Sequence, residues 1–293
     1  YDYQQRWVKN QVLNLSLVDR VKIFEYLNEN SLPENAEYLY DPYFNNCATK
    51  LRDIAKEILG NKIQFPSSFS DKNFTLRQLM NQELPWNTWG SFGINLALGN
   101  TLDKEIIADN YMYLPDYVHK AFQNATITKN KITTPLVLEE SQLLRYPEKQ
   151  IKIQWYNPFF VFSLLLLLTI VVTYRDQKRN IRSKWLDFTL FFVTGVLGII
   201  ICFLWFFTDH YTTPNNFNLL WAFVLNFFVA FTLLKNSIPS WISNYLLFYL
   251  FLLFGAIVTS FIGLQQFSNA VFPIIAMLFL RTFYIYRLLT FKK

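Results

Sequence analysis

The sequence has few side chains that can act as a nucleophile or its base, because its 293 residues include two cysteines and two histidines. Cys47 lies in the more polar N-terminal half and Cys202 in a long apolar run, so we expect no disulfide between them. If the N-terminal half faces an oxidising compartment, a single thiol without a disulfide partner there is open to oxidation and needs a functional reason to persist. This favours a reactive Cys47, with a small buried apolar residue as the alternative, as for most free cysteines.

Acidic residues are scarce in the C-terminal half. Residues 1–154 hold 17 Lys and Arg against 18 Asp and Glu, whereas residues 155–293 hold 10 against 3. The basic residues gather between the first two apolar runs and at the C-terminal end: Arg175, Lys178, Arg179, Arg182, Lys184, Arg281, Arg287, Lys292 and Lys293. Basic clusters that flank apolar runs orient a chain in a membrane. The net charge of +6 therefore does not indicate a nucleic-acid partner.

Long apolar runs fill the C-terminal half. Five of them approach the roughly 20 residues that a helix needs to cross the hydrocarbon layer of about 30 Å. They lie at about 157–174, 186–207, 218–234, 243–264 and 268–289. Pro273 falls in the last run, where a kink is tolerated if neighbours satisfy the freed carbonyl. We therefore predict a bundle of five transmembrane helices.

Two of the loops between these runs, near 208–218 and 264–268, contain no Lys or Arg. The positive-inside rule then places residues 1–154 and both loops outside, and the basic loop and the C-terminus in the cytoplasm. We predict an extracytoplasmic domain over 1–154 and a membrane domain over 155–293. Since the chain begins at Tyr1 without a signal peptide, we expect it to be the C-terminal portion of a longer protein.

Helical patterns dominate the N-terminal domain, so the whole chain is predicted to be mainly α. Ser16 and Asp19 have the spacing of a capping box. Apolar residues recur on one face of that helix: Leu17, Val21, Phe24 and Leu27. Asn45 or Asn46 is the expected N-cap of a second helix, which Gly60 ends. Further helices are expected from Thr75, within 86–98 and over 114–122.

The second helix is the candidate site. With Asn46 as N-cap, Cys47 occupies the first helical position, where free N–H groups and the positive end of the helix dipole lie near its sulfur. That position favours the thiolate, which is the reactive form. The same N–H groups can bind an oxyanion when a thiolate attacks a carbonyl.

A catalytic thiol also needs a base, normally histidine. His119 lies beside Lys120 and is expected on a solvated helix face. His210 follows Asp209 at the outer end of the second apolar run, on the side predicted for Cys47. An alternative is that the Asp209–His210 stretch only ends one helix before the next begins near Asn218, with Trp221 as an anchor at the headgroups.

Three stretches carry a resemblance: "YLYDPYFNNCATKLRDI" (38–54), "YMYLPDYV" (111–118) and "TDHYTTPNNFNLLWAF" (208–223). They resemble the bacterial lipoprotein N-acyltransferase family, in which a periplasmic thiol domain is followed by five transmembrane helices. The resemblance implies a truncated papain-like (NlpC/P60-like) α+β fold for the thiol domain.

The resemblance also implies site residues. The family's cysteine nucleophile maps onto Cys47, and its Asp-His loop maps onto Asp209 and His210. The principal histidine of the family lies upstream of the cysteine, so we expect this chain alone to lack that base.

The implied activity is acyl transfer from a membrane phospholipid, through a thioester on the cysteine, to the N-terminal amine of a diacylated lipoprotein in the bacterial inner membrane. It needs no cofactor and no metal. Asn46 could donate to the oxyanion or only cap the helix, and Arg52 and Asp53 could form a structural pair or contact a headgroup. Aromatic-rich spans would line an acyl groove, although ordinary lipid-facing surface is the favoured alternative for most of these aromatic residues. Asn218 and Trp221 are candidate substrate-binding residues.

Two other functions stay open. One is a membrane-tethered cysteine peptidase or amidase that acts on cell-wall peptides, which the papain-like kinship permits. The other is a non-enzymatic membrane protein that binds a partner and whose cysteine merely packs. A tether needs one span, so five predicted spans with a polar Asp-His loop favour the acyltransferase.

Overall fold

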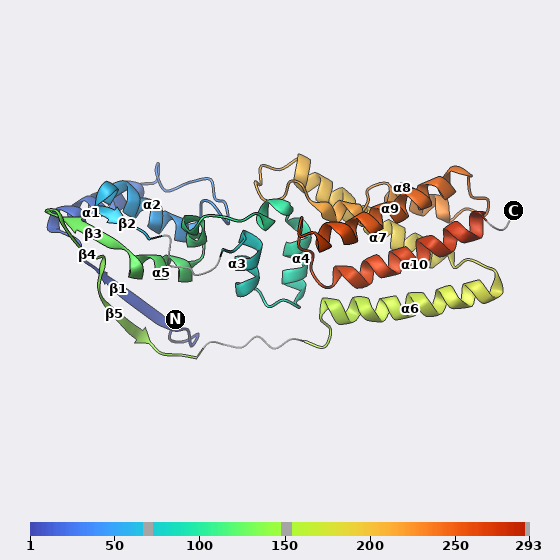
Figure 1. The fold of residues 1–293 in the computed structure, drawn as a ribbon, viewed down its shortest axis with the longest axis horizontal. Helices are drawn as coiled ribbons and strands as arrows, with labels where there is room; N and C mark the ends of the chain where they lie inside the picture. Colours follow the sequence, from blue (N-terminus) through green and yellow to red (C-terminus); the bar gives the residue numbers. More distant parts are fainter. Residues whose placement is uncertain (67–72, 148–153, 291–293) are drawn as a thin grey trace. The chain divides into compact units, whose positions relative to one another are not determined.

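The computed structural model describes residues 1–66, 73–147 and 154–290, which form two compact units. The first consists of Tyr1–Leu76 and Glu105–Ile151 and is called here the thiol unit, because it holds Cys47. The second consists of Arg77–Lys104 and Lys152–Lys293 and is called the membrane unit. Helices predominate (Figure 1), so the predicted mainly α class is confirmed.

The compact units do not follow one cut at residue 154. Residues 77–104, which we expected in the extracytoplasmic domain, belong with the C-terminal helices. The division into domains over 1–154 and 155–293 stays a prediction.

In its described residues, 1–66, 73–76 and 105–147, the thiol unit has three helices and two small sheets. The helices are α1 (Leu17–Asn30), α2 (Cys47–Leu59) and α5 (Pro115–Asn124), with 3-10 turns η1 (Gly60–Lys62) and η4 (Ala108–Tyr113). Antiparallel strands β1 (Val8–Leu13) and β5 (Val137–Leu144) form one sheet; β2 (Ile63–Gln64), β3 (Thr126–Lys129) and β4 (Ile132–Pro135) form the other in that order. The strands agree with an α+β thiol domain, whereas its papain-like character stays a prediction.

The predicted start of α1 is confirmed. The Ser16 side chain accepts the Asp19 N–H, and the Asp19 carboxylate accepts the Ser16 N–H, which completes a capping box. The carboxylate also pairs with Lys62 Nζ at 2.5 Å. The apolar stripe on this helix is exposed, however: Leu17, Val21, Phe24 and Leu27.

The core of the thiol unit lies beneath α2. Small and branched side chains from α2, α5 and β3 pack together there, and they include Ala48, Ala55, Val118, Ala121 and Ile127. Ala48 and Ala55 lie on the same side of α2, and that side is buried. Cys47, the first residue of the helix, lies off that side and is exposed.

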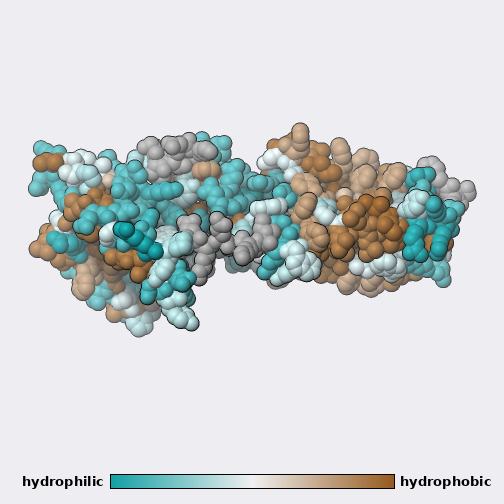
Figure 2. Space-filling model, turned by 90° about the horizontal axis from the view of Figure 1, so that it is seen from below, coloured by the Kyte–Doolittle hydropathy of each residue, from teal (hydrophilic) through white to brown (hydrophobic). Residues whose placement is uncertain are grey.

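Among the described residues of the membrane unit, four helices are long and apolar enough to cross a membrane. They are α6 (Pro158–Arg179), α7 (Lys184–Phe206), α9 (Trp241–Phe261) and α10 (Val271–Thr290). Figure 2 shows apolar residues over the membrane unit and hydrophilic residues at the end where Figure 1 places the C-terminus. Pro273 lies in the first turn of α10, where backbone N–H groups have no acceptor within the helix. Its missing N–H therefore breaks no helical hydrogen bond and gives no reason for the expected kink.

The third apolar run, over 218–234, does not form the single continuous helix that we predicted. Only the 3-10 turn η5 (Phe217–Leu220) and the eight-residue α8 (Asn226–Leu233) form there. The segment still runs the length of the unit, because its first end bonds Gln265, after α9, and its last end reaches the Lys184–Asn236 hydrogen bond at the start of α7. Residues 217–233 thus pass through the unit as two short helical pieces, η5 and α8, with an irregular stretch between them, and are called here the broken segment.

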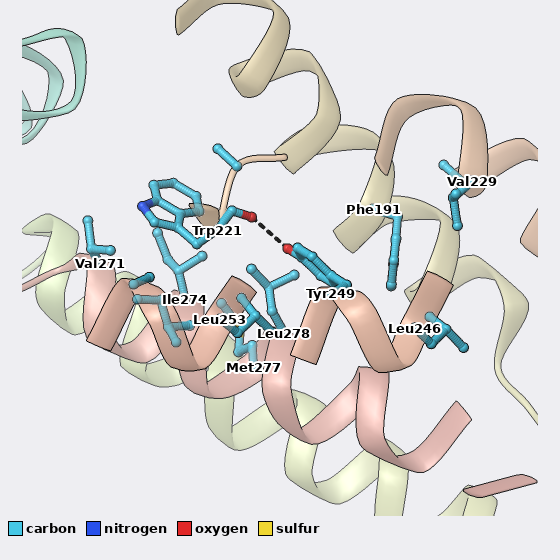
Figure 3. Close-up of a cluster of buried hydrophobic side chains, with 14 of the residues drawn as sticks. Phe191, Trp221, Val229, Leu246, Tyr249, Leu253, Val271, Ile274, Met277 and Leu278 are labelled. Carbon is cyan, nitrogen blue, oxygen red and sulfur yellow. Dashed lines mark hydrogen bonds between the residues drawn. The ribbon is translucent and has the colours of Figure 1, made fainter. Parts of the chain in front are cut away.

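Contacts from distant residues stabilise the break (Figure 3). The Tyr249 hydroxyl donates to the Trp221 carbonyl at 2.6 Å, which satisfies a backbone acceptor that the missing helix leaves free. Asn226 donates to Thr194 and accepts from Tyr245. The Tyr249 hydroxyl thus satisfies a backbone carbonyl in the apolar interior, as water does elsewhere, and the Asn226 side chain ties the segment to α7 and α9.

Glycines on α7 bring the broken segment close. A Cβ at Gly198 would lie 2.2 Å from the Ala222 carbonyl oxygen, and one at Gly195 would lie 2.2 Å from the Phe227 nitrogen. Any larger residue would therefore push the broken segment away from α7.

Polar contacts hold residues 77–104 together and join them to the C-terminal part of the membrane unit. They form most of α3 (Leu76–Glu83), all of α4 (Trp89–Ala97) and the 3-10 turn η3 (Asn100–Asp103). Arg77 is fully buried and donates to Asp103 and to the carbonyls of Leu98 and Gly99. Asn216 donates to the carbonyls at the end of α4, which fixes that helix to the loop after α7.

Candidate functional site

Cys47 is the first residue of α2 and its side chain is exposed. Its place at the helix N-terminus, predicted from the sequence, is confirmed. The sulfur therefore lies at the positive end of a thirteen-residue helix and is open to an incoming molecule. These are two of the conditions that a cysteine nucleophile needs.

Asn46 caps this helix, and both the oxygen and the nitrogen of its side-chain amide form hydrogen bonds. Its Oδ1 accepts the N–H groups of Ala48 and Thr49, each at 2.9 Å. Its Nδ2 donates to the carbonyls of Pro42 and Tyr113, at 2.8 and 2.9 Å. Both amide hydrogens are thus used, so the side chain acts as a cap and has no donor left for an oxyanion.

The backbone N–H of Cys47 differs in its hydrogen bonding from the N–H groups of Ala48 and Thr49. The first-turn N–H groups of Ala48 and Thr49 are occupied by the cap, whereas the N–H of Cys47 has no acceptor among the residues that the structure describes. It is a free donor beside the sulfur, at the place where an oxyanion donor is needed.

The loop before the cysteine is a closed turn. The Asp41 carboxylate accepts the N–H groups of Tyr43 and Phe44, and Asp41 and Asn45 form a backbone bridge. Tyr43 is buried with its ring 5.1 Å from that of Tyr113. Other apolar side chains of this loop are exposed: Tyr38, Leu39, Tyr40 and Phe44. The thiol therefore follows an exposed aromatic stretch.

Arg52 and Asp53 form the structural pair that was one of their two expected roles. Arg52 Nη2 lies 2.8 Å from the Asp53 carboxylate, and Arg52 Nη1 donates to the Asp109 carbonyl of η4. Lys56 pairs with the Asp109 carboxylate at 2.5 Å. Asp109 was missed by sequence reasoning, because nothing in its neighbourhood indicates a partner more than fifty residues away.

His119 lies on α5 and is partly covered rather than fully solvated. Its Nε2 lies 3.4 Å from the Glu140 carboxylate of β5. The strand was not predicted, and neither was this contact.

Asp209 and His210 lie in the loop after α7, and both are exposed. Neither side chain has a hydrogen bond or ion pair within the described part of the chain. The pair is therefore accessible, and a role of His210 as base stays a prediction.

Asn218 and Trp221 are both buried. Asn218 accepts the Trp221 indole N–H at 2.9 Å and donates to the Leu96 carbonyl. Full burial is incompatible with the expected anchoring role of Trp221. These contacts account for both side chains, and their substrate-binding role stays a prediction.

Two family models match the chain. The model described as the Lnb transmembrane domain matches residues 149–293, and the one described as the Lnb N-terminal periplasmic domain matches residues 1–82. The chain belongs to the Lnb family. No curated protein and no solved structure matches it.

The Lnb matches confirm the family resemblance drawn from the three sequence stretches. Together with the apolar helices, they identify a membrane protein with a periplasmic N-terminal domain. Membership of the Lnb family also suggests an enzyme, and Cys47 lies within the matched periplasmic domain.

Proposed function

We propose that this protein transfers an acyl chain from a membrane phospholipid, through a thioester on Cys47, to the N-terminal amine of a diacylated lipoprotein. One observation carries the proposal: an exposed thiol begins a capped helix in a chain of the Lnb family. Covalent catalysis of this kind divides one difficult acyl transfer into two easier ones.

The two steps balance without a cofactor. First, the Cys47 sulfur attacks the ester carbonyl carbon; the C–S bond forms, the C–O bond breaks, and the lysophospholipid oxygen leaves with a proton. Second, the lipoprotein amine attacks the thioester; the C–N bond forms, the C–S bond breaks, and the amine proton is passed on as the thiol is regenerated. Thioester to amide is downhill, so the second step needs no nucleotide.

We assign the N–H of Cys47 to the oxyanion of the first step. The Asn46 cap occupies the next two N–H groups, which leaves this donor for the developing charge. Asn46 is then a positioning residue, because it fixes the first turn and touches no reacting atom.

We assign His210 as a base, with Asp209 as a supporting residue next to it in the chain. Both side chains are exposed and without partners among the described residues. His210→Ala should lower the rate of thioester formation by about 10²–10⁴-fold, the usual contribution of a general base. His119→Ala is the matched control and should leave the rate unchanged, because the His119 imidazole lies on α5 beside Glu140 of β5. Equal rates in the wild type and His210→Ala would remove His210 from the mechanism.

The proposed location is the bacterial inner membrane, with the thiol unit in the periplasm and the C-terminus in the cytoplasm. The excess of Lys and Arg in the α6–α7 loop and at the C-terminal end supports this orientation. Donor and acceptor are both anchored in the outer leaflet, so a thiol held at the same surface meets them at high effective concentration.

A labelling experiment tests the thiol. Membranes containing the full-length protein, with any residues that precede Tyr1, are incubated with a phospholipid that carries a fluorescent acyl chain, and the protein is separated under non-reducing conditions. The wild type and Cys202→Ala should carry a label that hydroxylamine removes, whereas Cys47→Ala should carry none. A hydroxylamine-sensitive label of equal intensity on Cys47→Ala would end the proposal.

The acceptor needs a separate experiment. Lipoprotein N-termini are compared by mass spectrometry in cells that produce the wild type and in cells that produce Cys47→Ala. Triacylated N-termini should be replaced by diacylated ones in the variant. Unchanged triacylation would exclude the lipoprotein as acceptor even if Cys47 forms a thioester.

A further inference from the structure

The end of the membrane unit that carries the α6–α7 loop has an excess of unpaired positive charge. Its two acidic residues, Asp176 and Asp187, are buried and both pair with the fully buried Arg281. Arg182 pairs with Asp187 as well. The remaining cations have no ion pair among the described residues: Arg175, Lys178, Arg179, Lys184, Lys235 and Arg287. We call this end the basic end.

Two hollows lie along α10 and share residues. One, of about 450 Å³, is almost wholly apolar and lies between α9 and α10, where Ala276 and Phe279 line it. The other, of about 350 Å³, lies between the last turns of α6 and α10 at the basic end. Leu280 and Phe283 line both hollows, so an apolar groove continues into the basic end.

The second hollow is polar at its far end. Gln177 of α6, Asn180 directly after α6 and Arg287 of α10 line it, and Arg287 is exposed and the sole cation among its lining residues. No acidic side chain is among the described residues that line it. An anion placed there would meet a guanidinium and two amide groups and no opposing charge.

The groove has the dimensions of a lipid chain in one leaflet. From Ala276 to Arg287 the helix rises about 17 Å, close to the half-thickness of about 15 Å of the hydrocarbon layer. Basic pockets between transmembrane helices bind anionic headgroups, and Arg binds phosphate through two parallel hydrogen bonds.

We propose that an anionic glycerophospholipid binds here, with its phosphate on Arg287 and one acyl chain along α10 in the groove past Phe283 and Ala276. The site lies at the opposite end of α7 from the Asp209–His210 loop, about 33 Å away along the helix axis. It is therefore a second lipid site, separate from the proposed acyl donor, and does not depend on the acyltransferase proposal.

Titration of the purified whole chain in detergent tests this proposal by native mass spectrometry, with phosphatidylglycerol and phosphatidylcholine of the same chains as probes. The wild type should bind one phosphatidylglycerol in preference to phosphatidylcholine. Arg287→Gln should weaken phosphatidylglycerol binding about tenfold, as loss of a charge-assisted hydrogen bond predicts. Arg175→Gln removes the same charge from the same end but does not line the hollow, and it should bind like the wild type.

A second variant tests the acyl part of the site. Ala276 is exposed within the apolar hollow, so Ala276→Phe should fill the hollow without disturbing the fold and should weaken phosphatidylglycerol binding as well. Equal losses in Arg287→Gln and Arg175→Gln would overturn the proposal in favour of diffuse electrostatic attraction. Equal binding of the two lipids, undiminished binding by Ala276→Phe, or a dimer that fills the groove in place of lipid would also overturn it.

Discussion

Replacing Asn46 with alanine should loosen the helix that carries the thiol. The change removes the acceptor for two first-turn N–H groups and the donor for the buried carbonyl of Tyr113. Loss of an Asn cap costs about 1 kcal/mol, and a buried carbonyl without a donor costs about 1–3 kcal/mol. We therefore expect α2 to lose about 2–4 kcal/mol of local stability. The yield of Cys47 thioester should fall with it, because the cap fixes the first turn.

Hydrogen exchange measured by mass spectrometry reads this loss directly. Amides at the start of α2 should exchange about 30- to 700-fold faster in Asn46→Ala, since each 1.4 kcal/mol is a factor of ten. The matched control is Asn45→Ala, which removes one exposed hydrogen bond to the Leu39 carbonyl and should change exchange by less than about tenfold. Wild-type exchange in Asn46→Ala, or equal acceleration in the two variants, would refute the role given to the cap.

Three further changes probe other parts of the fold. Arg281→Met leaves the buried carboxylate of Asp176 without its cation and that of Asp187 with Arg182 alone, so the protein in detergent should lose about 3–5 kcal/mol; an unchanged melting temperature would contradict this. Burial acts to raise the pKa of Asp19, but hydrogen bonds, above all from Lys62, outweigh it and lower that pKa below its ordinary value. The stabilisation from the Asp19–Lys62 pair is complete above the unfolded pKa of about 3.9 and is lost as the pH falls through the lowered pKa. Asp19→Asn should therefore have a lower melting temperature than the wild type at pH 7, and the difference in melting temperature should narrow below about pH 4. The same difference in melting temperature at both pH values would contradict this role of the pair. Tyr249→Phe removes the donor to the Trp221 carbonyl and should cost about 1–3 kcal/mol in thermal unfolding, whereas no loss would mean that the carbonyl has another partner.

The helix that presents the thiol was predictable because its signals are local. Asn46, Cys47 and Thr49 stand within four positions, and capping chemistry acts over that range. The same holds for Ser16 and Asp19 at the start of α1.

The strands and the third apolar run were not predictable in the same way. β5 has no clean alternation of apolar and polar residues, and its partner β1 lies more than a hundred residues earlier. Residues 218–234 have the composition of a span, but the break after η5 is stabilised by Gly198 and Tyr249 on other helices. A sequence window does not contain those contacts.

The candidate site was found only in part for the same reason. The pairing of Arg52 with Asp53 is one position apart and was among the expected roles, whereas its bond to Asp109 depends on how η4 packs on α2. The burial of Trp221 likewise depends on contacts that the tertiary fold brings together.

The most direct measurement of the central claim is peptide mass spectrometry of the full-length protein, with any residues that precede Tyr1, after incubation with phospholipid and no acceptor. We predict that the peptide containing Cys47 gains the mass of one fatty-acyl group, and that adding a diacylated lipoprotein peptide removes it. An unmodified Cys47 under these conditions, with the acyl group on another residue or on none, would contradict the account.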